Sequence, residues 1–321
     1  MRIVFAGSPQ AALPVLTYLE QSTHDLVAVL SRPDAPSGRG RKLAQSPVSS
    51  YAAQHDLMLY QPKTLKNNTE AATFLRDLQP DLGVIVAYGA ILPADILEIP
   101  KFGWINIHFS LLPRWRGAAP VQRALQEGDT QTGVTVFQLE PALDTGPIYA
   151  TCSYEVPESA TAGDVLLELA ELSVRPLEQA LSMIEGGVAP EPQADTGVTY
   201  APPLHPSEGE IDWSAPSDTI ANHIRGFTPS PGAWTMWQES RVKLGVLESN
   251  PPLTMPIPPL EPGQIFTTRH EVWVGTGSAP VCLGNVAPAG KKPMPAEAWA
   301  RGAHLESSAK FTTSRSMGGQ E

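Results

Sequence analysis

Two polar residues stand two positions apart in an otherwise apolar segment, Ile105-Asn106-Ile107-His108. In a β-strand, residues i and i+2 point to the same face, so Asn106 and His108 are expected to point out together. A carboxamide can donate its NH₂ group to a developing oxyanion, which is worth about 10²- to 10³-fold in rate. An imidazole can bind the same oxygen and transfer protons, which is worth about 10²- to 10⁴-fold. The pair predicts a site for acyl transfer.

A carboxylate follows in a turn, Leu143-Asp144-Thr145-Gly146, directly after a predicted strand over residues 133–139. Because the ends of neighbouring strands converge, we expect Asp144 to lie near His108, where it could orient the ring and favour its cationic form. The sequence leaves the route of the transferred proton open between these two groups. The simpler interpretation is that Asn106 and His108 are structural residues whose buried polar groups form hydrogen bonds with the backbone. That interpretation does not account for Asp144. No Gly-x-Ser-x-Gly motif occurs, which argues against a serine hydrolase.

Strands and helices alternate along the first half of the chain, which predicts an α/β fold with a doubly wound parallel sheet. Ligands of such sheets bind beyond the carboxyl ends of the strands, where His108 lies. The turn Gly7-Ser8-Pro9 lacks the second and third glycines of a dinucleotide fingerprint, which argues against a nicotinamide cofactor. The predicted strands cover residues 2–6, 26–31, 57–60, 82–87 and the segment of Asn106, and predicted helices end near residue 20 or cover 47–55, 68–78 and 162–185.

A change in composition after residue 187 predicts a second domain. We expect a catalytic domain over residues 1–187 and a Pro-rich linker over 188–206. Short strands punctuated by Gly and Pro then predict a small barrel over 207–310. Residues 311–321 are rich in Ser, Thr and Gly and are expected to be a disordered tail.

The net charge of −11 argues against a protein that coats nucleic acid through its overall field. A nucleic-acid partner would need local basic patches, such as Arg32–Lys42 or Arg114–Arg123, although most short basic clusters are solvated surface loops. Cys152 and Cys282 stand far apart in the sequence, so neither a disulfide framework nor a metal site is expected. No apolar run suits a signal peptide or a membrane span, and we expect a cytoplasmic protein without a membrane partner.

The motif Asn-x-His-x-Ser-Leu-Leu-Pro-x-x-Arg-Gly, followed by Leu-Asp-Thr-Gly, resembles the folate-dependent formyltransferases. The segments RPDAPSGRGRKL, VAYGAILP, SLLPRWRGAAPVQRAL, IDWS and PAGKK are similar, in the same order, to members of that family that act on methionyl-tRNA. The resemblance implies a Rossmann-like formyltransferase domain followed by a small OB-like β-barrel domain. It also implies 10-formyltetrahydrofolate as co-substrate and methionyl-initiator tRNA as partner, with no metal, and we expect a monomer.

Residue roles follow from the same resemblance. It implies that Asn106, His108 and Asp144 are catalytic, and that the folate site includes Ser110, Leu111, Leu112 and Pro113, with Val86, Tyr88 and Gly89 nearby. Phe109 stands where many relatives have a small residue, and we expect it to pack away from the site.

The segment over residues 32–43 resembles the insertion loop that enters the acceptor end of the tRNA in the family's tRNA-directed members. Arg39 matches the position of an arginine that is important in that loop. Trp115 could stack on a base or pack in the protein. The proposed contacts to tRNA phosphates are Arg39, Arg41, Lys42, Lys291 and Lys292.

Two other functions remain open at this point. A sugar-amine formyltransferase shares the Asn-x-His and Ser-Leu-Leu-Pro motifs and the folate donor, although the basic insertion and PAGKK favour the tRNA enzyme. A non-catalytic folate- or RNA-binding module would keep the fold but need not keep Asn106, His108 and Asp144.

Overall fold

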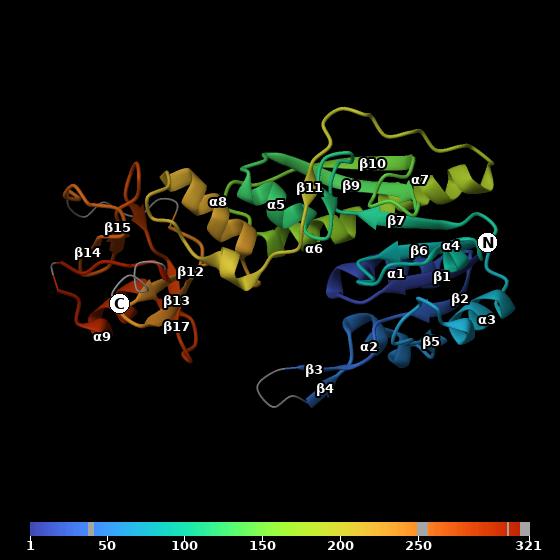
Figure 1. Ribbon diagram of the computed structural model, residues 1–321, viewed down its shortest axis with the longest axis horizontal. Coiled ribbons are helices and arrows are strands. Elements are labelled where there is room, and N and C mark those ends of the chain that lie inside the picture. The colour runs from blue at the N-terminus through green and yellow to red at the C-terminus, as the bar shows by residue number, and fades with distance from the viewer. Residues whose placement is uncertain (38–41, 249–255, 307, 315–321) are drawn as a thin grey trace. The chain divides into compact units, whose positions relative to one another are not determined.

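The computed structural model of the protein describes residues 1–37, 42–248, 256–306 and 308–314 (Figure 1). The chain divides into two compact units. The first contains residues 1–120, 131–155 and 166–201, and the second contains 121–130, 156–165 and the residues from 202 onward. Within the described ranges, no helix has both the length and the apolar character needed to cross a membrane.

The first unit is built on a mixed sheet that has seven strands among the described residues. The five strands from β7 to β5 pair in parallel, as predicted. β9, which was expected in the same parallel sheet, and β10, which was not predicted, add an antiparallel edge. The Rossmann-like α/β fold is therefore confirmed. In spatial order the strands are β10 (Ile148–Glu155), β9 (Gln131–Gln138), β7 (Trp104–His108), β6 (Leu82–Val86), β1 (Arg2–Gly7), β2 (Asp25–Leu30) and β5 (Leu59–Tyr60).

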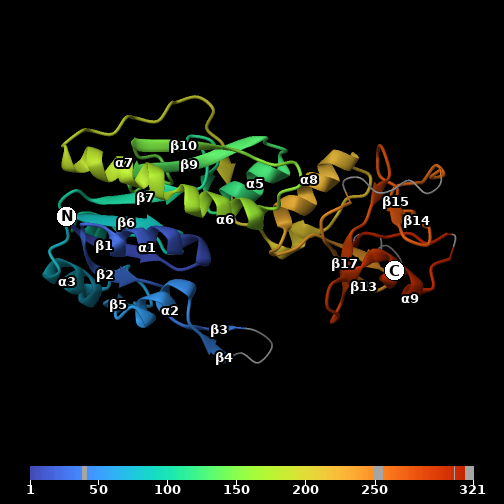
Figure 2. The same cartoon turned by 180° about the vertical axis from the view of Figure 1, so that it is seen from behind.

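Helices pack against this sheet through buried apolar side chains. One cluster joins Val4 and Ala6 of β1 to the helices α3 and α4, while α7 lies along β9 and β10 (Figure 2). The helix predicted over residues 162–185 is interrupted at Ser173, a buried residue whose hydroxyl donates to the carbonyl of Ala170 at 2.5 Å. The helices are η1 (Gln10–Ala12), α1 (Leu13–Gln21), α2 (Pro47–Gln54), α3 (Thr69–Asp77), α4 (Ala94–Leu97), α6 (Ala162–Leu172) and α7 (Val174–Glu185).

The register of the sheet places the end of β7 next to the end of β6. Ile85 pairs with Asn106 in the parallel ladder, so both strands end at the same edge. In the antiparallel ladder, by contrast, Ile105 pairs with Gln138, so β9 ends beside the start of β7. Asp144 does lie near His108, as expected, but the reason given for it, that the ends of neighbouring strands converge, was wrong. The loop over residues 139–147 carries Asp144 back to His108.

The segment predicted as a linker is hydrogen-bonded to the first unit over much of its length. Glu191 forms a bridge with Ile148, and β11 (Tyr200–Ala201) pairs in parallel with β8 (Arg116–Gly117). The prolines of this segment lack N–H donors, but the residues between them still pair. We call residues 188–201 the strap.

A two-stranded antiparallel hairpin, β3 (Ala35–Ser37) and β4 (Lys42–Ala44), occupies the position of the predicted basic loop. Arg39 and Arg41 lie outside the described residues, and Lys42 is the first residue of β4.

Among its described residues, the second unit has two small antiparallel sheets around one core of buried side chains, which confirms the prediction of short strands. Phe311 is 2% exposed and stacks between Trp213 and Trp299, so the predicted tail begins later than residue 311. Residues 315–321 of that tail lie outside the described residues. The elements are β12 (Trp234–Trp237), β13 (Ser240–Leu244), β17 (Asn285–Pro288) and β18 (Met294–Pro295) in one sheet, β14 (Ile265–Thr267), β15 (Val272–Val274) and β16 (Val281–Cys282) in the other, with α5 (Pro120–Gln126), η2 (Pro206–Gly209), α8 (Ser217–Phe227) and α9 (Ala296–Ala303).

Candidate active site

Every residue of β7 except Asn106 is buried. Ile105 and Ile107 are buried, Asn106 is half-buried, and His108 is 5% exposed. Within the part of the chain that the structure describes, the Asn106 carboxamide makes no hydrogen bond, so it is available to a ligand. Phe109 is also buried and belongs to the core, as expected.

The imidazole of His108 has one nitrogen committed to the protein. Its Nε2 lies 2.8 Å from the carbonyl oxygen of Trp115. A carbonyl only accepts hydrogen bonds, so Nε2 must carry the hydrogen. In the neutral ring Nδ1 is then unprotonated, and it lies 3.8 Å from Oδ2 of Asp144. Nδ1 is thus the nitrogen that can accept a proton.

Burial controls the protonation of this ring. Burial lowers the pKa of His108, while the charge of Asp144 and the bond to the Trp115 carbonyl oppose the shift without cancelling it. We therefore assign a neutral imidazole at pH 7. The charge of Asp144 favours the cationic form, as expected. However, a carboxylate 3.8 Å away, without a direct hydrogen bond, does not offset the loss of water around the buried ring.

Asp144 is held in an unusual conformation. Its φ of +50° lies in the left-handed region, and its Oδ2 accepts a hydrogen bond of 2.8 Å from the backbone N–H of Gly117. Such a backbone conformation costs energy in a residue other than glycine and persists only where the surroundings impose it. The loop is therefore fixed with its carboxylate toward Nδ1 of His108.

The turn after β7 is closed by side-chain hydrogen bonds. The buried Ser110 hydroxyl donates to the carbonyl of Arg114 at 2.6 Å. Thr135 donates to the Ser110 carbonyl at 2.7 Å and accepts from the N–H of Leu112 at 3.1 Å. Ser110 was expected to contribute to a folate site, but its hydroxyl is used to hold this turn. Leu112 is buried, whereas its neighbours Leu111 and Pro113 are half-buried.

The other predicted folate residues lie where β6 ends. Val86 is the last residue of that strand, and Gly89 follows with a φ of +77°. Burial raises the pKa of Tyr88 to about 12, so its phenol is neutral. The carbonyl of Tyr88 accepts from the Ser8 hydroxyl at 3.2 Å. Because β6 and β7 are parallel neighbours, both sets of predicted folate residues follow strands at one edge of the sheet.

Trp115 packs in the protein rather than presenting a free face. Its side chain is 8% exposed, and the guanidinium carbon of Arg114 lies 4.5 Å from the ring centroid. Its φ of +65° lies in the left-handed region, and its carbonyl binds Nε2 of His108. The role of a buried packing residue is therefore supported over that of a base-stacking residue.

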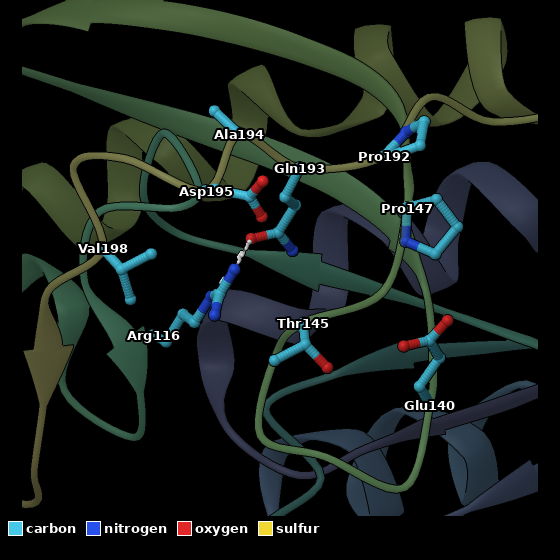
Figure 3. Close-up of a pocket in the computed structure, with 9 residues that line it drawn as sticks. All are labelled: Arg116, Glu140, Thr145, Pro147, Pro192, Gln193, Ala194, Asp195 and Val198. Carbon is cyan, nitrogen blue, oxygen red and sulfur yellow. Dashed lines mark hydrogen bonds between the residues drawn. The ribbon is translucent and has the colours of Figure 1, made fainter.

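Gln193 of the strap was missed by the sequence analysis. Its Nε2 donates to the carbonyls of Asp144 and Gly146, both at 2.8 Å. Its Oε1 accepts from Nε and Nη2 of Arg116 at 3.1 and 2.6 Å (Figure 3). Gln193, Arg116 and Thr145 line a cleft of about 450 Å³. No local pattern marks a glutamine whose partners are distant in the sequence, so no signal could have identified it.

Of the predicted tRNA contacts, Lys42 is the first residue of β4, and Arg39 and Arg41 lie outside the described residues. Lys291 and Lys292 are exposed in the turn after β17, in the second unit. Their role in tRNA binding stays a prediction.

Comparison with known proteins identifies the family. Residues 1–181 match the formyl transferase family, and residues 203–304 match the formyl transferase C-terminal domain. The chain is 48% identical to the methionyl-tRNA formyltransferase of Acidothermus cellulolyticus, an alignment that covers 97% of this chain and 100% of that protein. It is 47% identical to the methionyl-tRNA formyltransferase of Salinispora tropica, with 95% of this chain and 98% of that protein covered.

A solved structure shares the fold. The structure of HypX from Aquifex aeolicus in complex with tetrahydrofolic acid aligns with a TM-score of 0.65 at 18% identity, over 95% of this chain and 48% of that chain. At this identity the likeness supports the fold alone. The matches to both domains and the identity to full-length relatives together show that the chain belongs to the formyl transferase family, among the methionyl-tRNA formyltransferases.

Proposed function

We propose that the protein transfers the formyl group of 10-formyltetrahydrofolate to the α-amino group of methionine esterified to initiator tRNA. Family membership supports the reaction class. The observation that carries the proposal is the state of His108: Nε2–H is bound to the Trp115 carbonyl, and Nδ1 lies beside the Asp144 carboxylate. Such a ring can take a proton from an attacking amine.

In the proposed reaction, the neutral amine of methionine attacks the formyl carbon and forms the new C–N bond. The formyl oxygen becomes an oxyanion, which receives a hydrogen bond from the NH₂ group of Asn106. Nδ1 of His108 accepts the proton of the amine, and the charge of Asp144 stabilises the resulting imidazolium. As the bond to the folate nitrogen breaks, the proton passes to that nitrogen and tetrahydrofolate leaves.

This assignment changes the role first given to His108. A ring that is neutral, with its one hydrogen bound to the Trp115 carbonyl, has no donor for the oxyanion. We therefore assign the oxyanion to Asn106 and proton transfer to His108. A base with a pKa below about 6.5 is already in its active form at pH 7.

The two co-substrates are assigned to different parts of the chain. We place the folate at the shared edge of β6 and β7, against Leu111, Pro113 and Gly89, where the backbone turns away from the sheet. We propose that tRNA phosphates contact Lys42, at the start of the second strand of the hairpin, and Lys291 and Lys292, in the turn after β17. Arg39 and Arg41 keep this proposed role from the sequence.

The test is an assay with purified protein, 10-formyltetrahydrofolate and three acceptors: methionyl-initiator tRNA, methionyl-elongator tRNA and a nucleotide-linked amino sugar. We expect N-formylmethionine on the initiator tRNA, at a higher rate than on the elongator tRNA. Formylation of the amino sugar alone would assign the protein to the sugar-directed enzymes. Formylation of no acceptor would contradict the proposal.

A further inference from the structure

We propose that Gln193 is a positioning residue, which holds together the two segments that contact His108. One segment is the loop of Asp144, and the other is the turn that contains Trp115 and Arg116. The inference rests on the proposed function for its effect on rate, but its geometric part stands on hydrogen bonds that the structure shows directly.

The carboxamide of Gln193 is fully used between these segments. A glutamine has two donor hydrogens and an acceptor oxygen with two lone pairs. Both donors go to carbonyls of the first segment, those of Asp144 and Gly146, and the oxygen accepts twice from Arg116 of the second segment. Figure 3 shows the side chain extending from the strap to meet Arg116. The flipped amide would set its oxygen against two carbonyls and its NH₂ group against the guanidinium of Arg116, so it would satisfy neither segment.

Each segment supplies one contact to the imidazole. The loop supplies the carboxylate of Asp144 opposite Nδ1, and the turn supplies the Trp115 carbonyl that accepts from Nε2. The segments also meet directly, since the N–H of Gly117 donates to Asp144. Gln193 thus fixes the spacing of the two groups that set the tautomer and the charge environment of His108.

Thr199 strengthens the same connection at the far end of the strap. Its Oγ1 accepts from the N–H of Trp115, and its carbonyl accepts from the N–H of Arg116, both at 2.9 Å. These bonds orient the peptide that carries the Trp115 carbonyl. The strap therefore acts on His108 through two of its own residues.

The exposure of the strap argues against a role in the core. Pro192 and Ala194, which flank Gln193, are exposed, and only Gln193 between them is half-buried. Truncating it should leave the buried apolar clusters intact. The effect is expected on rate rather than on folding, because misplacement of a catalytic group by about 1 Å can cost roughly 10²-fold.

The variants Gln193→Ala and Gln193→Glu separate the contributions. The glutamate keeps the shape and the two bonds from Arg116, but it cannot donate to the two carbonyls. We expect both variants to lower kcat about tenfold, with the KM of each co-substrate within about threefold of wild type. Gln54→Ala is the matched control, since Gln54 is an exposed residue at the end of α2 bonded to Ser50, and it should match wild type.

A double variant distinguishes positioning from a structural effect. If Gln193 acts through Asp144, then adding Gln193→Ala to Asp144→Asn should cause little further loss of kcat, so the two effects are not additive. Additive losses would overturn the inference, because they would show that Gln193 acts independently of the loop. Near wild-type kcat in both single variants would overturn it as well.

A readout without turnover keeps the inference separate from the proposed reaction. In Gln193→Ala and Gln193→Glu the loop of Asp144 loses its two hydrogen bonds from the strap, and only the N–H of Gly117 still holds the carboxylate. NMR titration should therefore show the His108 pKa shifted in the direction seen in Asp144→Asn. An unchanged His108 titration in both Gln193 variants overturns the inference, whatever the activity. If the His108 titration shifts in a protein that formylates no acceptor, the positioning role of Gln193 is supported and only the proposed function is contradicted.

Discussion

The end of β7 and the turn of Lys291 and Lys292 are built on opposite principles. His108 is buried, one ring nitrogen is bonded, and its neighbours are fixed by hydrogen bonds from the strap. Lys291 and Lys292 are exposed in a turn. Catalysis of bond formation needs catalytic groups held in a fixed geometry, whereas electrostatic attraction to phosphate needs only positive charge near the surface. A protein with a net charge of −11 must supply that charge locally.

The largest expected effect comes from removing the imidazole. We expect His108→Ala to lower kcat/KM for methionyl-initiator tRNA by about 10²- to 10⁴-fold, because the attacking amine loses its proton acceptor. His55→Ala, at the exposed end of α2, is the matched control and should retain full activity. A loss of less than about threefold in His108→Ala would remove His108 from the chemistry.

The second effect tests the oxyanion. Asn106→Ala should lower kcat and kcat/KM together by about 10²- to 10³-fold, because the lost bond forms only in the transition state. Steady-state kinetics with both co-substrates provide the measurement. An increase in KM with kcat unchanged would show that Asn106 binds substrate and does not stabilise the oxyanion.

Sequence patterns predicted the groups at the end of β7 because each is encoded locally. The apolar run broken at Asn106 and His108 marks a strand that ends in a polar site, and Ser46 with Pro47 marks the start of α2, where the Ser46 hydroxyl accepts from the N–H of Ser49 at 3.0 Å. Alternation of strands and helices was sufficient to predict an α/β fold with a parallel sheet, and the family resemblance then implied that it is Rossmann-like.

Long-range pairing was not predictable in the same way. The direction of β9 depends on its partners, and nothing in its own residues distinguishes an antiparallel edge from a parallel one. The strap was predicted as a linker because its composition is rich in proline, but Gln193 and Thr199 bond residues distant in the sequence. That burial outweighs the charge of Asp144 in setting the pKa of His108 could not be predicted either, because it depends on how the ring is packed.

A smaller effect is expected from the exposed cations. The double variant Lys291→Ala/Lys292→Ala should raise the KM for tRNA several-fold at low salt, leave kcat unchanged, and reduce the slope of log KM against log salt by about 2. Lys63→Ala/Lys66→Ala removes two exposed cations of the first unit and serves as the control. A fall in kcat, or equal effects of both double variants, would contradict a local phosphate contact.

The smallest effect concerns stability. The pKa of His108 in the folded protein lies below its usual value of about 6.5, so the unfolded chain binds a proton more readily between the two values. Relative to His108→Gln, wild type should lose free energy of unfolding as the pH falls below about 6.5. Urea unfolding of both proteins across this range measures the difference. A difference that stays constant, or that favours wild type at lower pH, would contradict the lowered pKa.

The central claim is that a neutral imidazole, bonded through Nε2–H to Trp115, presents an unprotonated Nδ1 at the end of β7. ¹⁵N NMR of the His108 ring tests it most directly, because the shifts of the two nitrogens report which one carries the hydrogen. The structure predicts a protonated Nε2 at pH 7 and a titration midpoint below about 6.5. A hydrogen on Nδ1 at pH 7, or a midpoint above that value, would contradict the account.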